Sequence, residues 1–357
     1  MSNKLSSFIQ ENEAPYAAKK IGVYDASGSR IGEISLGKLK PNYGTRLYRF
    51  GFLSDVHNST DTAGTADPSR DLKHALEFFD SKESVSFTVV AGDITNTNAD
   101  GEWETYHTNI NAHSPHTRVY ACSGNHDGTN GLKIDKFKEC TEQNDITYSF
   151  DKTWTGSDGE QHTDHFILFS LRYWNFTTIG DTGGYTQTDL DWLDAKLTEY
   201  QNDRTFVIMH LFWADGAGNF KERYPASNWY GGALKTAMRA IRAKHPNVIW
   251  LSGHSHWKWY LQKYQADANI KRLPDGCWTA HVPSCANPID SVPSDAEATG
   301  WTRQTVSAGS EGAVIDVYED CIDFRGIVFK EASINGPNDS AYTDLYIPVA
   351  QYRLKTF

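Results

Sequence analysis

The sequence has few features of a membrane protein or of a disulfide-stabilised secreted protein. No apolar run approaches the ~18 residues needed to cross a bilayer, and the first residues, Met1 to Lys4, do not begin an apolar signal core. Five cysteines are present without any CxxC spacing, which argues against a disulfide framework and against a zinc ribbon. These absences predict a cytoplasmic protein of a reducing compartment that has no membrane partner.

Positive charge is also scarce. The 357 residues include 34 Lys and Arg against 45 Asp and Glu, which gives a formal net charge of −11. Duplex DNA and anionic lipid both attract clustered basic side chains, so this charge argues against duplex DNA as a partner. Aromatic residues make up 13% of the chain, too many for a disordered protein. The sequence therefore predicts a folded, acidic protein whose length allows about two domains.

Short apolar runs alternate with helical patterns along the chain. The runs are rich in β-branched or aromatic residues, as buried strands are. They cover residues 48–53, 85–91, 118–121, 206–209 and 248–251. Helical periodicity is present over residues 69–82, 188–200 and 232–244, with Thr188 as the candidate N-cap of the second helix. This alternation predicts an α/β sandwich.

Outside these elements, hairpins and loops are expected. Residues 20–37 and 313–329 each contain two strand-like runs around a short polar turn, which is typical of a hairpin. Residues 58–69 and 286–311 are polar and are expected to be loops. The second of these is long enough that a functional role is more common than for a short connector.

Each of the five predicted strands is followed by residue types that bind metals. These residues are Asp55 and His57, then Asp93, then Asn125, His126 and Asp127, then His210, and finally His254 and His256. In open α/β sheets, ligands gather at the carboxyl ends of the strands. Gly92, Gly124 and Gly253 come directly before three of the blocks, as a tight turn with close backbone approach requires. Any one of these residues alone could be an ordinary loop residue, whereas the five blocks together predict a binding site.

The donor set indicates which metals would bind. Without His126 and Asp127, the set contains two carboxylates, one amide oxygen and four imidazoles. This mixture of oxygen and nitrogen suits Mn, Fe, Co, Ni or Zn rather than Mg or Ca. Seven ligands are too many for one tetrahedral zinc ion, but two divalent ions that share one carboxylate would have four ligands each. Two such ions about 3.5–4 Å apart can hold a hydroxide and clamp a phosphoryl group.

These blocks, in this order, resemble the calcineurin-like metallophosphoesterase family. The resemblance implies an α/β fold, a four-layer α/β/β/α sandwich of two mixed sheets. It also implies that one ion is held by Asp55, His57, Asp93 and His256, and the other by Asp93, Asn125, His210 and His254. Asp93 would bridge the two ions. His126 would face the scissile ester as the proton donor, and Asp127 would orient it, unless Asp127 is simply the N-cap of a helix over residues 131–140.

Two subgroups of the family have motif residues that this chain lacks, which argues against membership of either subgroup. Purple acid phosphatases have a Tyr where this chain has Asn96, and protein Ser/Thr phosphatases have Asp-Arg-Gly where this chain has Asp93-Ile94-Thr95. The residues of the second block, Gly92 to Thr95, and of the third block, Gly124 to Asp127, are similar to those of the small bacterial phosphodiesterases of the family. The resembling metallophosphoesterase domain is expected at residues 46–330. The rest of the chain would then be an N-terminal arm with the predicted β-hairpin at residues 1–45 and a C-terminal tail at residues 331–357.

The implied function is a metal-dependent phosphoric ester hydrolase, with phosphodiesters favoured and a metal-bridging hydroxide as nucleophile. Its partner would be a phosphate-ester small molecule or a nucleotide, and the alternative within this class is a phosphomonoesterase or nucleotidase. Candidate substrate-binding residues are Trp213, Trp229, Tyr230 and His281. For the three aromatic rings the alternative is core packing, and for His281 the alternative is a structural role. An alternative of another class is a structural or binding module of a phage or cell-surface assembly with an incidental metal site. The sequence predicts no oligomeric state.

Overall fold

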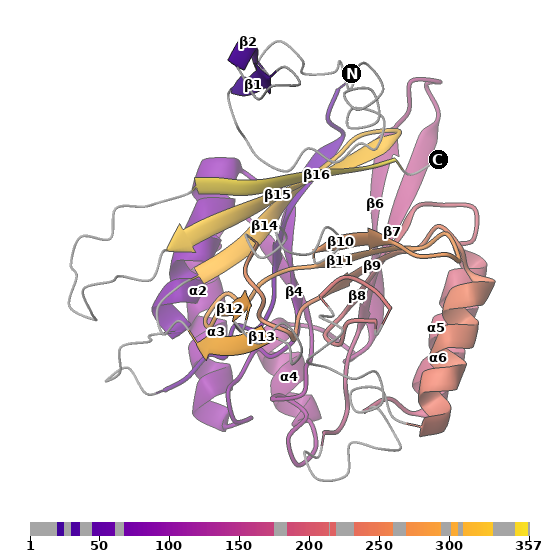
Figure 1. The fold of residues 1–357 in the computed structure, drawn as a ribbon. Helices are drawn as coiled ribbons and strands as arrows, with labels where there is room; N and C mark the ends of the chain where they lie inside the picture. Colours follow the sequence, from indigo (N-terminus) through magenta and orange to yellow (C-terminus); the bar gives the residue numbers. More distant parts are fainter. Residues whose placement is uncertain are drawn as a thin grey trace, which may run out of the picture.

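Two six-stranded sheets face each other, with helices on both outer sides (Figure 1). The computed structural model describes residues 20–24, 30–35, 45–60, 68–174, 184–213, 215–218, 232–259, 269–293, 301–305, 310–330 and 347–355. Among these residues, no helix combines the length and the apolar character needed to span a bilayer.

The first sheet is mixed and has the order β16-β15-β14-β3-β4-β5. Its parallel half consists of β3 (Tyr48–Leu53), β4 (Phe87–Ala91) and β5 (Arg118–Cys122). Its antiparallel half consists of β14 (Ser310–Val317), β15 (Cys321–Lys330) and β16 (Ile347–Lys355). Strand β4 is buried along its whole length, as a parallel strand covered on both faces must be.

The second sheet is also mixed and has the order β10-β11-β9-β8-β7-β6. Its parallel strands are β7 (Gln161–Phe169), β8 (Thr205–Met209), β9 (Ile249–Ser252) and β11 (Trp278–His281). The antiparallel edge strands are β6 (Tyr148–Thr155) and β10 (Ile270–Arg272). All the parallel strands of this sheet therefore end at one edge.

Helices complete the four layers. The first sheet is covered by α2 (Pro68–Glu77), which a π-helical turn continues over Phe78–Glu83, and by α3 (Asp100–His113) and α4 (Ile134–Thr141). The second sheet is covered by α5 (Gln187–Glu199) and α6 (Gly232–Lys244) on the opposite side (Figure 1). The predicted four-layer α/β/β/α sandwich is confirmed.

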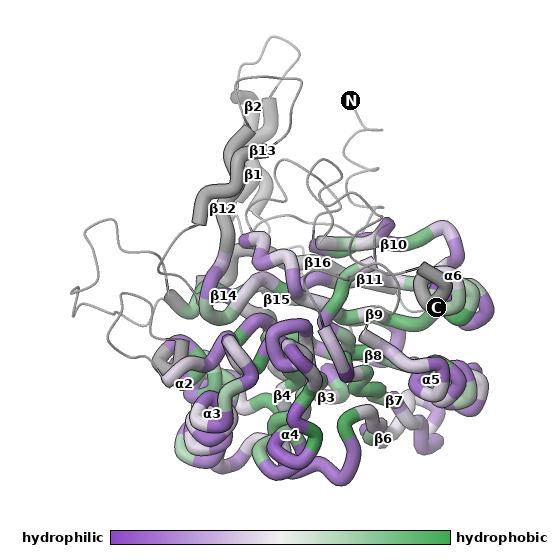
Figure 2. The backbone as a smooth tube through the Cα atoms, turned by 90° about the horizontal axis from the view of Figure 1, so that it is seen from below, coloured by the Kyte–Doolittle hydropathy of each residue, from purple (hydrophilic) through white to green (hydrophobic). Residues whose placement is uncertain are grey.

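The core between the sheets is aromatic. Phe50 of β3 packs edge-on against Phe166 and Phe206 of the second sheet, with ring centroids 5.4 and 5.7 Å apart. Figure 2 shows that hydrophobic residues concentrate on the central strands and hydrophilic residues on the surrounding helices. Edge-to-face aromatic pairs of this kind add to the stability that burial alone supplies. This packing fixes the two sheets against each other and so fixes the edge at which their strands end.

All five predicted strands, the three predicted helices and both hairpins are present, the first hairpin as β1 (Lys20–Tyr24) and β2 (Arg30–Ser35). The N-cap prediction was wrong by two residues. Thr186 caps α5, because its hydroxyl accepts from Asp189 N while the Asp189 carboxylate accepts from Thr186 N. Thr188 lies inside the helix.

The expected long loop over residues 286–311 was also wrong, since it contains β12 (Ile289–Pro293) and β13 (Trp301–Thr305), which pair with each other. Strand β16 pairs with β15, so the first sheet extends into the segment described from the sequence as a tail.

Candidate metal centre

Loops from both sheets meet at the carboxyl ends of their parallel strands. The loops after β3 and β4 are joined by the backbone bond from Asp55 N to Gly92 O, 3.0 Å, and the loops after β8 and β9 by that from Gly253 N to His210 O, 3.1 Å. The two sheets are connected here by His254 N, which donates to Asp55 Oδ2 at 2.8 Å. All seven predicted ligands lie at this junction.

One group of ligand atoms forms around Asp55. Single donor atoms of Asp55, His57, Asp93 and His256 all lie within 4.8 Å of one another. His256 Nε2 is 2.9 Å from Asp55 Oδ1 and 3.1 Å from His57 Nε2. The set is the same as the one that the family resemblance implies for the first ion.

A second group forms around His210. Its Nε2 lies 3.2 Å from Asp93 Oδ2, 3.0 Å from His254 Nδ1 and 2.8 Å from Asn125 Oδ1. Donor atoms of Asp93, His210 and His254 again lie within 4.8 Å of one another. Asp93 belongs to both groups, as a bridging carboxylate must.

The orientation of two histidines shows that this donor set fits cations. His210 Nδ1 lies 2.8 Å from the Ala91 carbonyl, and His256 Nδ1 lies 3.1 Å from the Asn287 carbonyl. A carbonyl oxygen only accepts, so both Nδ1 atoms carry a proton, and Nε2 is the nitrogen of each ring that faces a carboxylate, at 3.2 Å from Asp93 Oδ2 for His210 and 2.9 Å from Asp55 Oδ1 for His256. A ring nitrogen this close to a carboxylate oxygen needs a proton or a metal ion between the two atoms. Metal-binding histidines are held by this same kind of bond from the second ring nitrogen.

The pKa shifts describe the same convergence of charge. Burial alone would lower the pKa of His210, but Asp93 and Asp55 raise it to about 9. Burial dominates at His57 and lowers its pKa to about 3. Burial would raise the pKa of Asp55, yet His256 and His210 hold it well below its usual range. Before a metal binds, a proton on His210 therefore supplies the positive charge that the carboxylates require.

The ligand loops are also strained. Five of the predicted ligands have a left-handed backbone although none is glycine. They are Asp55 with φ 52°, His57 with 45°, Asp93 with 50°, His254 with 75° and His256 with 61°. Such conformations persist only where the surrounding structure over-determines them, and they concentrate at functional sites. The glycines before three blocks allow this crowding; for example, a Cβ at Gly124 would collide with the Asp93 carboxylate.

Comparison with known families identifies this arrangement. The sequence model of the calcineurin-like phosphoesterases matches residues 48–258, which span all five blocks. The chain belongs to this family. It is thus a metallophosphoesterase of the phosphoester hydrolase class with a candidate dimetal site.

Among solved structures, the chain is similar to a dimetal phosphatase from Danio rerio at 15% identity and a TM-score of 0.53, over 81% of this chain and 98% of that one. The calcineurin-like phosphoesterase YfkN from Bacillus subtilis is similar at 12% identity and a TM-score of 0.42, over 87% and 90%. No curated protein matches the sequence. At these identities, the dimetal phosphatase supports the fold alone.

In this calcineurin-like phosphoesterase, His126 lies beside the two groups of ligand atoms and belongs to neither. Its ring stands nearly perpendicular to that of His57, with centroids 4.6 Å apart. His126 Nδ1 lies 2.6 Å from the Asn96 carbonyl and therefore donates to it. The Asn96 carbonyl therefore fixes the orientation of the ring, a role that no motif in the sequence indicated.

The structure corrects the expected contact of Asp127. Its buried carboxylate accepts hydrogen bonds from Gly124 N at 2.8 Å, Ile94 N at 3.0 Å and both N and Oγ1 of Thr95 at 2.8 and 2.7 Å. Asp127 therefore ties together the loops that carry Asp93 and Asn125, while Asn96 orients His126. Asp127 is not a helix N-cap either, because α4 begins only at Ile134.

The residues expected to bind substrate have different surroundings. Trp213 is buried under α6, edge-on to Trp250 with centroids 5.0 Å apart. His281 is fully buried, with Nε2 2.7 Å from Ser255 Oγ. Trp229 and Tyr230 lie outside the described residues. The geometry of Trp213 favours the packing alternative.

Two aromatic side chains outside the four candidate substrate-binding residues flank the second ligand group. Trp174 stands edge-on to His254 with ring centroids 6.2 Å apart, and Phe212 lies 5.9 Å from the same ring. The position of Phe212, two residues after His210, was a usable signal. Trp174 had none, because it follows a strand that the apolar pattern did not reveal.

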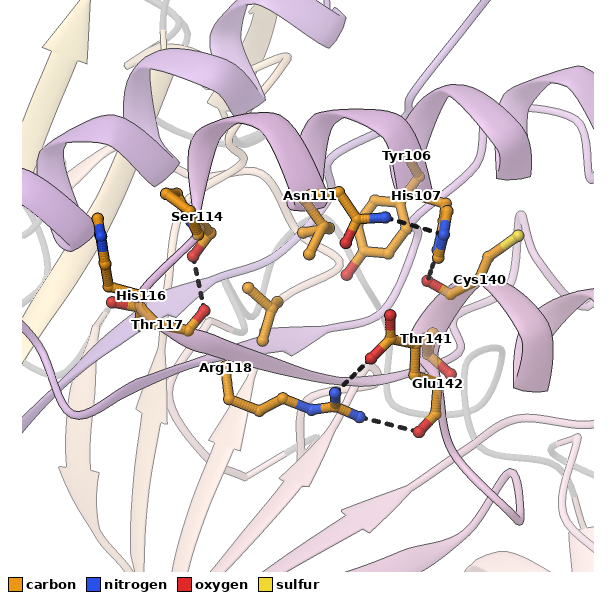
Figure 3. A pocket seen from close by; sticks show the side chains of 13 residues that line it. Tyr106, His107, Asn111, Ser114, His116, Thr117, Arg118, Cys140, Thr141 and Glu142 are labelled. Atoms are coloured by element: carbon orange, nitrogen blue, oxygen red, sulfur yellow. Dashed lines mark hydrogen bonds and ion pairs between the residues drawn. The ribbon is translucent and has the colours of Figure 1, made fainter.

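A cavity of about 240 Å³ lies elsewhere, between α3, α4 and the start of β5 (Figure 3). Tyr106, His107, Arg118 and Glu142 line it, and Arg118 is paired with Glu142 across its rim. It opens at the amino end of β5, whereas the ligand loops follow the carboxyl ends of the strands. None of the predicted site residues lines this cavity.

Proposed function

We propose that this calcineurin-like phosphoesterase is a metal-dependent hydrolase of phosphoric esters and that phosphodiesters are its preferred substrates. The observation that carries the proposal is the convergence of seven oxygen and nitrogen donors into two groups that share Asp93. We assign one ion to Asp55, His57, Asp93 and His256, and the other to Asp93, Asn125, His210 and His254. The donor types suit Mn, Fe, Zn, Co or Ni.

Two bound ions would supply the hydroxide nucleophile and stabilise the charge that develops on the phosphoryl oxygens. The protein's own residues hold the site in shape for this chemistry. Asp127 ties the second and third loops together through backbone N–H groups, and Gly124 lets those loops approach. Rigid loops matter because small errors in the position of reacting groups cost large factors in rate.

We assign proton donation to His126. Its Nδ1 proton is committed to the Asn96 carbonyl at 2.6 Å, so Nε2 is the atom that would hold a proton and give it to the leaving oxygen. The perpendicular contact with His57 places this ring beside the first ligand group without making it a ligand. Asn96 therefore acts as the positioning residue for the general acid.

The preference for diesters rests on charge balance. Two divalent ions supply four positive charges, Asp55 and Asp93 remove two, and a hydroxide removes one, which leaves a net charge of about +1. A phosphodiester carries a single negative charge and matches this site. Dianionic monoesters are the alternative that the experiment must separate.

The test is metal analysis followed by a substrate screen on the same preparation. The screen compares bis-nitrophenyl phosphate, nitrophenyl phosphate and cyclic nucleotides with added Mn²⁺, and Asp93→Asn is the matched control. We expect two ions per chain, faster turnover of the diesters and no turnover by the variant. Faster turnover of monoesters would reject the diester preference. Two bound ions without turnover of any ester would instead support a binding module.

A further inference from the structure

The segment His254 to His256, which carries the last two candidate ligands, has a backbone conformation that other groups must stabilise. Ser255 lies between His254 and His256, whose backbones are both left-handed, with φ 75° and 61°. Their ring nitrogens point into different ligand groups, His254 into that of His210 and His256 into that of Asp55. Such a conformation relaxes unless neighbouring groups hold it. The side chain of Ser255 is 1% exposed, so its contact lies inside the protein.

That contact is His281, the last residue of β11. His281 Nε2 lies 2.7 Å from Ser255 Oγ. Strand β11 runs parallel to β9 and pairs His281 with Ser252, which places the imidazole next to the loop that follows β9. Burial lowers the pKa of His281 to about 3, so the ring is neutral near pH 7 and can accept the hydroxyl proton of Ser255.

Neighbouring backbone encloses the His281 ring. Gly218 has φ 82°, and a Cβ there would lie 2.6 Å from His281 Cδ2. The adjacent Ala217 N donates to Thr279 Oγ1 on β11 at 2.9 Å, which fixes this short segment over the strand. The ring is therefore held between the ligand loop and the segment 215–218.

Asn269 lies across from His281 on the next strand. His281 N donates to Asn269 O at 2.7 Å, one residue beyond the last pair of β10 and β11, Ile270 with Ala280, so both side chains project from the same face of the sheet. Both are buried, at 0% and 1% exposure. Among the described residues, neither His281 Nδ1 nor the amide of Asn269 has a hydrogen-bond partner. Buried polar atoms are costly to leave unpaired, so this pair has a reason to lie here other than packing.

We propose that His281, whose backbone is bonded to Asn269, is a positioning residue: its side-chain bond to Ser255 holds His254 and His256 in place to bind two different ions. The inference rests on the proposed function only in taking these two histidines as metal ligands. In this role His281 acts through Ser255 and not directly on a metal ion or a substrate. The sequence left a pocket role and a structural role open for His281, and the geometry favours the second.

The test measures affinity for Mn²⁺ alone, by titration of the metal-free chain, for His281→Leu, His281→Gln and Ser255→Ala. The amide of Gln reaches about as far as Nε2 and can replace the acceptor, whereas Leu cannot. We expect His281→Leu and Ser255→Ala each to weaken binding about 5- to 100-fold, the effect of a lost buried hydrogen bond. The affinity of His281→Gln for Mn²⁺ should stay within about 3-fold of the wild type. A double variant that combines His281→Leu with Ser255→Ala should bind Mn²⁺ no more weakly than either single variant, because both changes remove the same hydrogen bond.

The matched control is His245→Leu. His245 is 7% exposed and bonds Asp194 Oδ1 at the same 2.7 Å, but it lies beyond the end of α6, before β9 begins. We expect it to lower the melting temperature without weakening Mn²⁺ binding. Equal binding loss in this control, or wild-type binding by both Ser255→Ala and His281→Leu, would overturn the inference. If His281→Leu does not fold, the comparison of Mn²⁺ affinity between Ser255→Ala and His281→Gln decides. The inference then requires weaker binding by Ser255→Ala and near wild-type binding by His281→Gln.

The same titration separates this inference from the proposed function. A wild-type chain that binds two Mn²⁺ ions but hydrolyses no ester would overturn the proposed hydrolase activity. The affinities of the variants would still decide the role of His281, because they do not depend on turnover.

Discussion

Replacing Trp213 by Ala tests whether an aromatic residue next to the candidate metal centre recognises substrate or holds the fold. Trp213 comes three residues after the ligand His210, yet its side chain is only 3% exposed. It stands at 89° to Trp250 with centroids 5.0 Å apart, and the guanidinium of Arg242 lies 4.5 Å from its ring centroid. This environment is that of a core residue between the second sheet and α6.

The expected cost follows from these contacts. Burying a Trp removes about 150–250 Å² from water, equivalent to about 4–6 kcal/mol at ~25 cal/mol per Å². The edge-to-face pair adds about 1 kcal/mol and the cation–π contact about 1 kcal/mol. Partial collapse of the cavity recovers some of this, so we expect Trp213→Ala to lower the free energy of unfolding by about 4 kcal/mol. Trp213→Phe should lose about half as much.

The assay combines urea unfolding of the metal-loaded protein with kcat/KM for one aryl and one alkyl phosphodiester. We expect both variants to bind both ions and to keep the aryl-to-alkyl ratio within about 2-fold of the wild type. A loss of stability below about 1 kcal/mol together with a ratio that falls 5-fold or more would refute the reasoning. In that case the ring would be stacking on the leaving group.

Three further predictions concern the site itself. Asp93→Asn should lose more metal than Asp55→Asn, because Asp93 belongs to both ligand groups; equal metal content in the two variants would contradict the bridge. His126→Ala should keep both ions and lose about 10²–10⁴ in rate, less for a nitrophenolate leaving group than for an alkoxide, and a loss independent of the leaving group would point to phosphate positioning instead. The metal-free protein should lose about 3 kcal/mol of stability as the pH rises from 6.5 to 9, because the folded state raises the pKa of His210 to about 9 and holds its proton more tightly than the unfolded chain. His210→Gln should remove this slope in urea unfolding, and an unchanged slope would place the proton elsewhere.

Local sequence pattern was sufficient for the elements that carry the site. Parallel strands buried on both faces are continuous apolar runs, so residues 48–53 and 206–209 could be recognised without knowledge of their neighbours. Ligands that follow a strand directly keep their position relative to it, so Asp55 and His210 could be assigned to strand ends. Hairpins were recognisable for the same reason, since their two strands are close in sequence.

Elements with a weak local signal were missed. Helix α3 has little amphipathic periodicity, although it buries Trp103 and Tyr106 against the first sheet. Strands β12 and β13 were taken for a loop, because a polar two-stranded ribbon lacks the apolar run that marks a core strand. The capping box at Thr186 was assigned two residues too late, as element boundaries depend on backbone hydrogen bonds that composition does not reveal.

The sequence by itself determined the family, the two-sheet architecture and the seven candidate ligands, because each can be recognised from short sequence blocks without knowledge of distant contacts. Only the tertiary structure decided how those donors combine. His57 and His256 are 199 residues apart and meet at 3.1 Å, and Asp55 accepts from His254 N across the junction of the sheets. Such contacts depend on the register and packing of the two sheets, to which many weak interactions along the whole chain contribute. The carbonyl of Asn96 behind His126 and the hydroxyl of Ser255 against His281 are likewise products of that packing, and no spacing in the sequence encodes them.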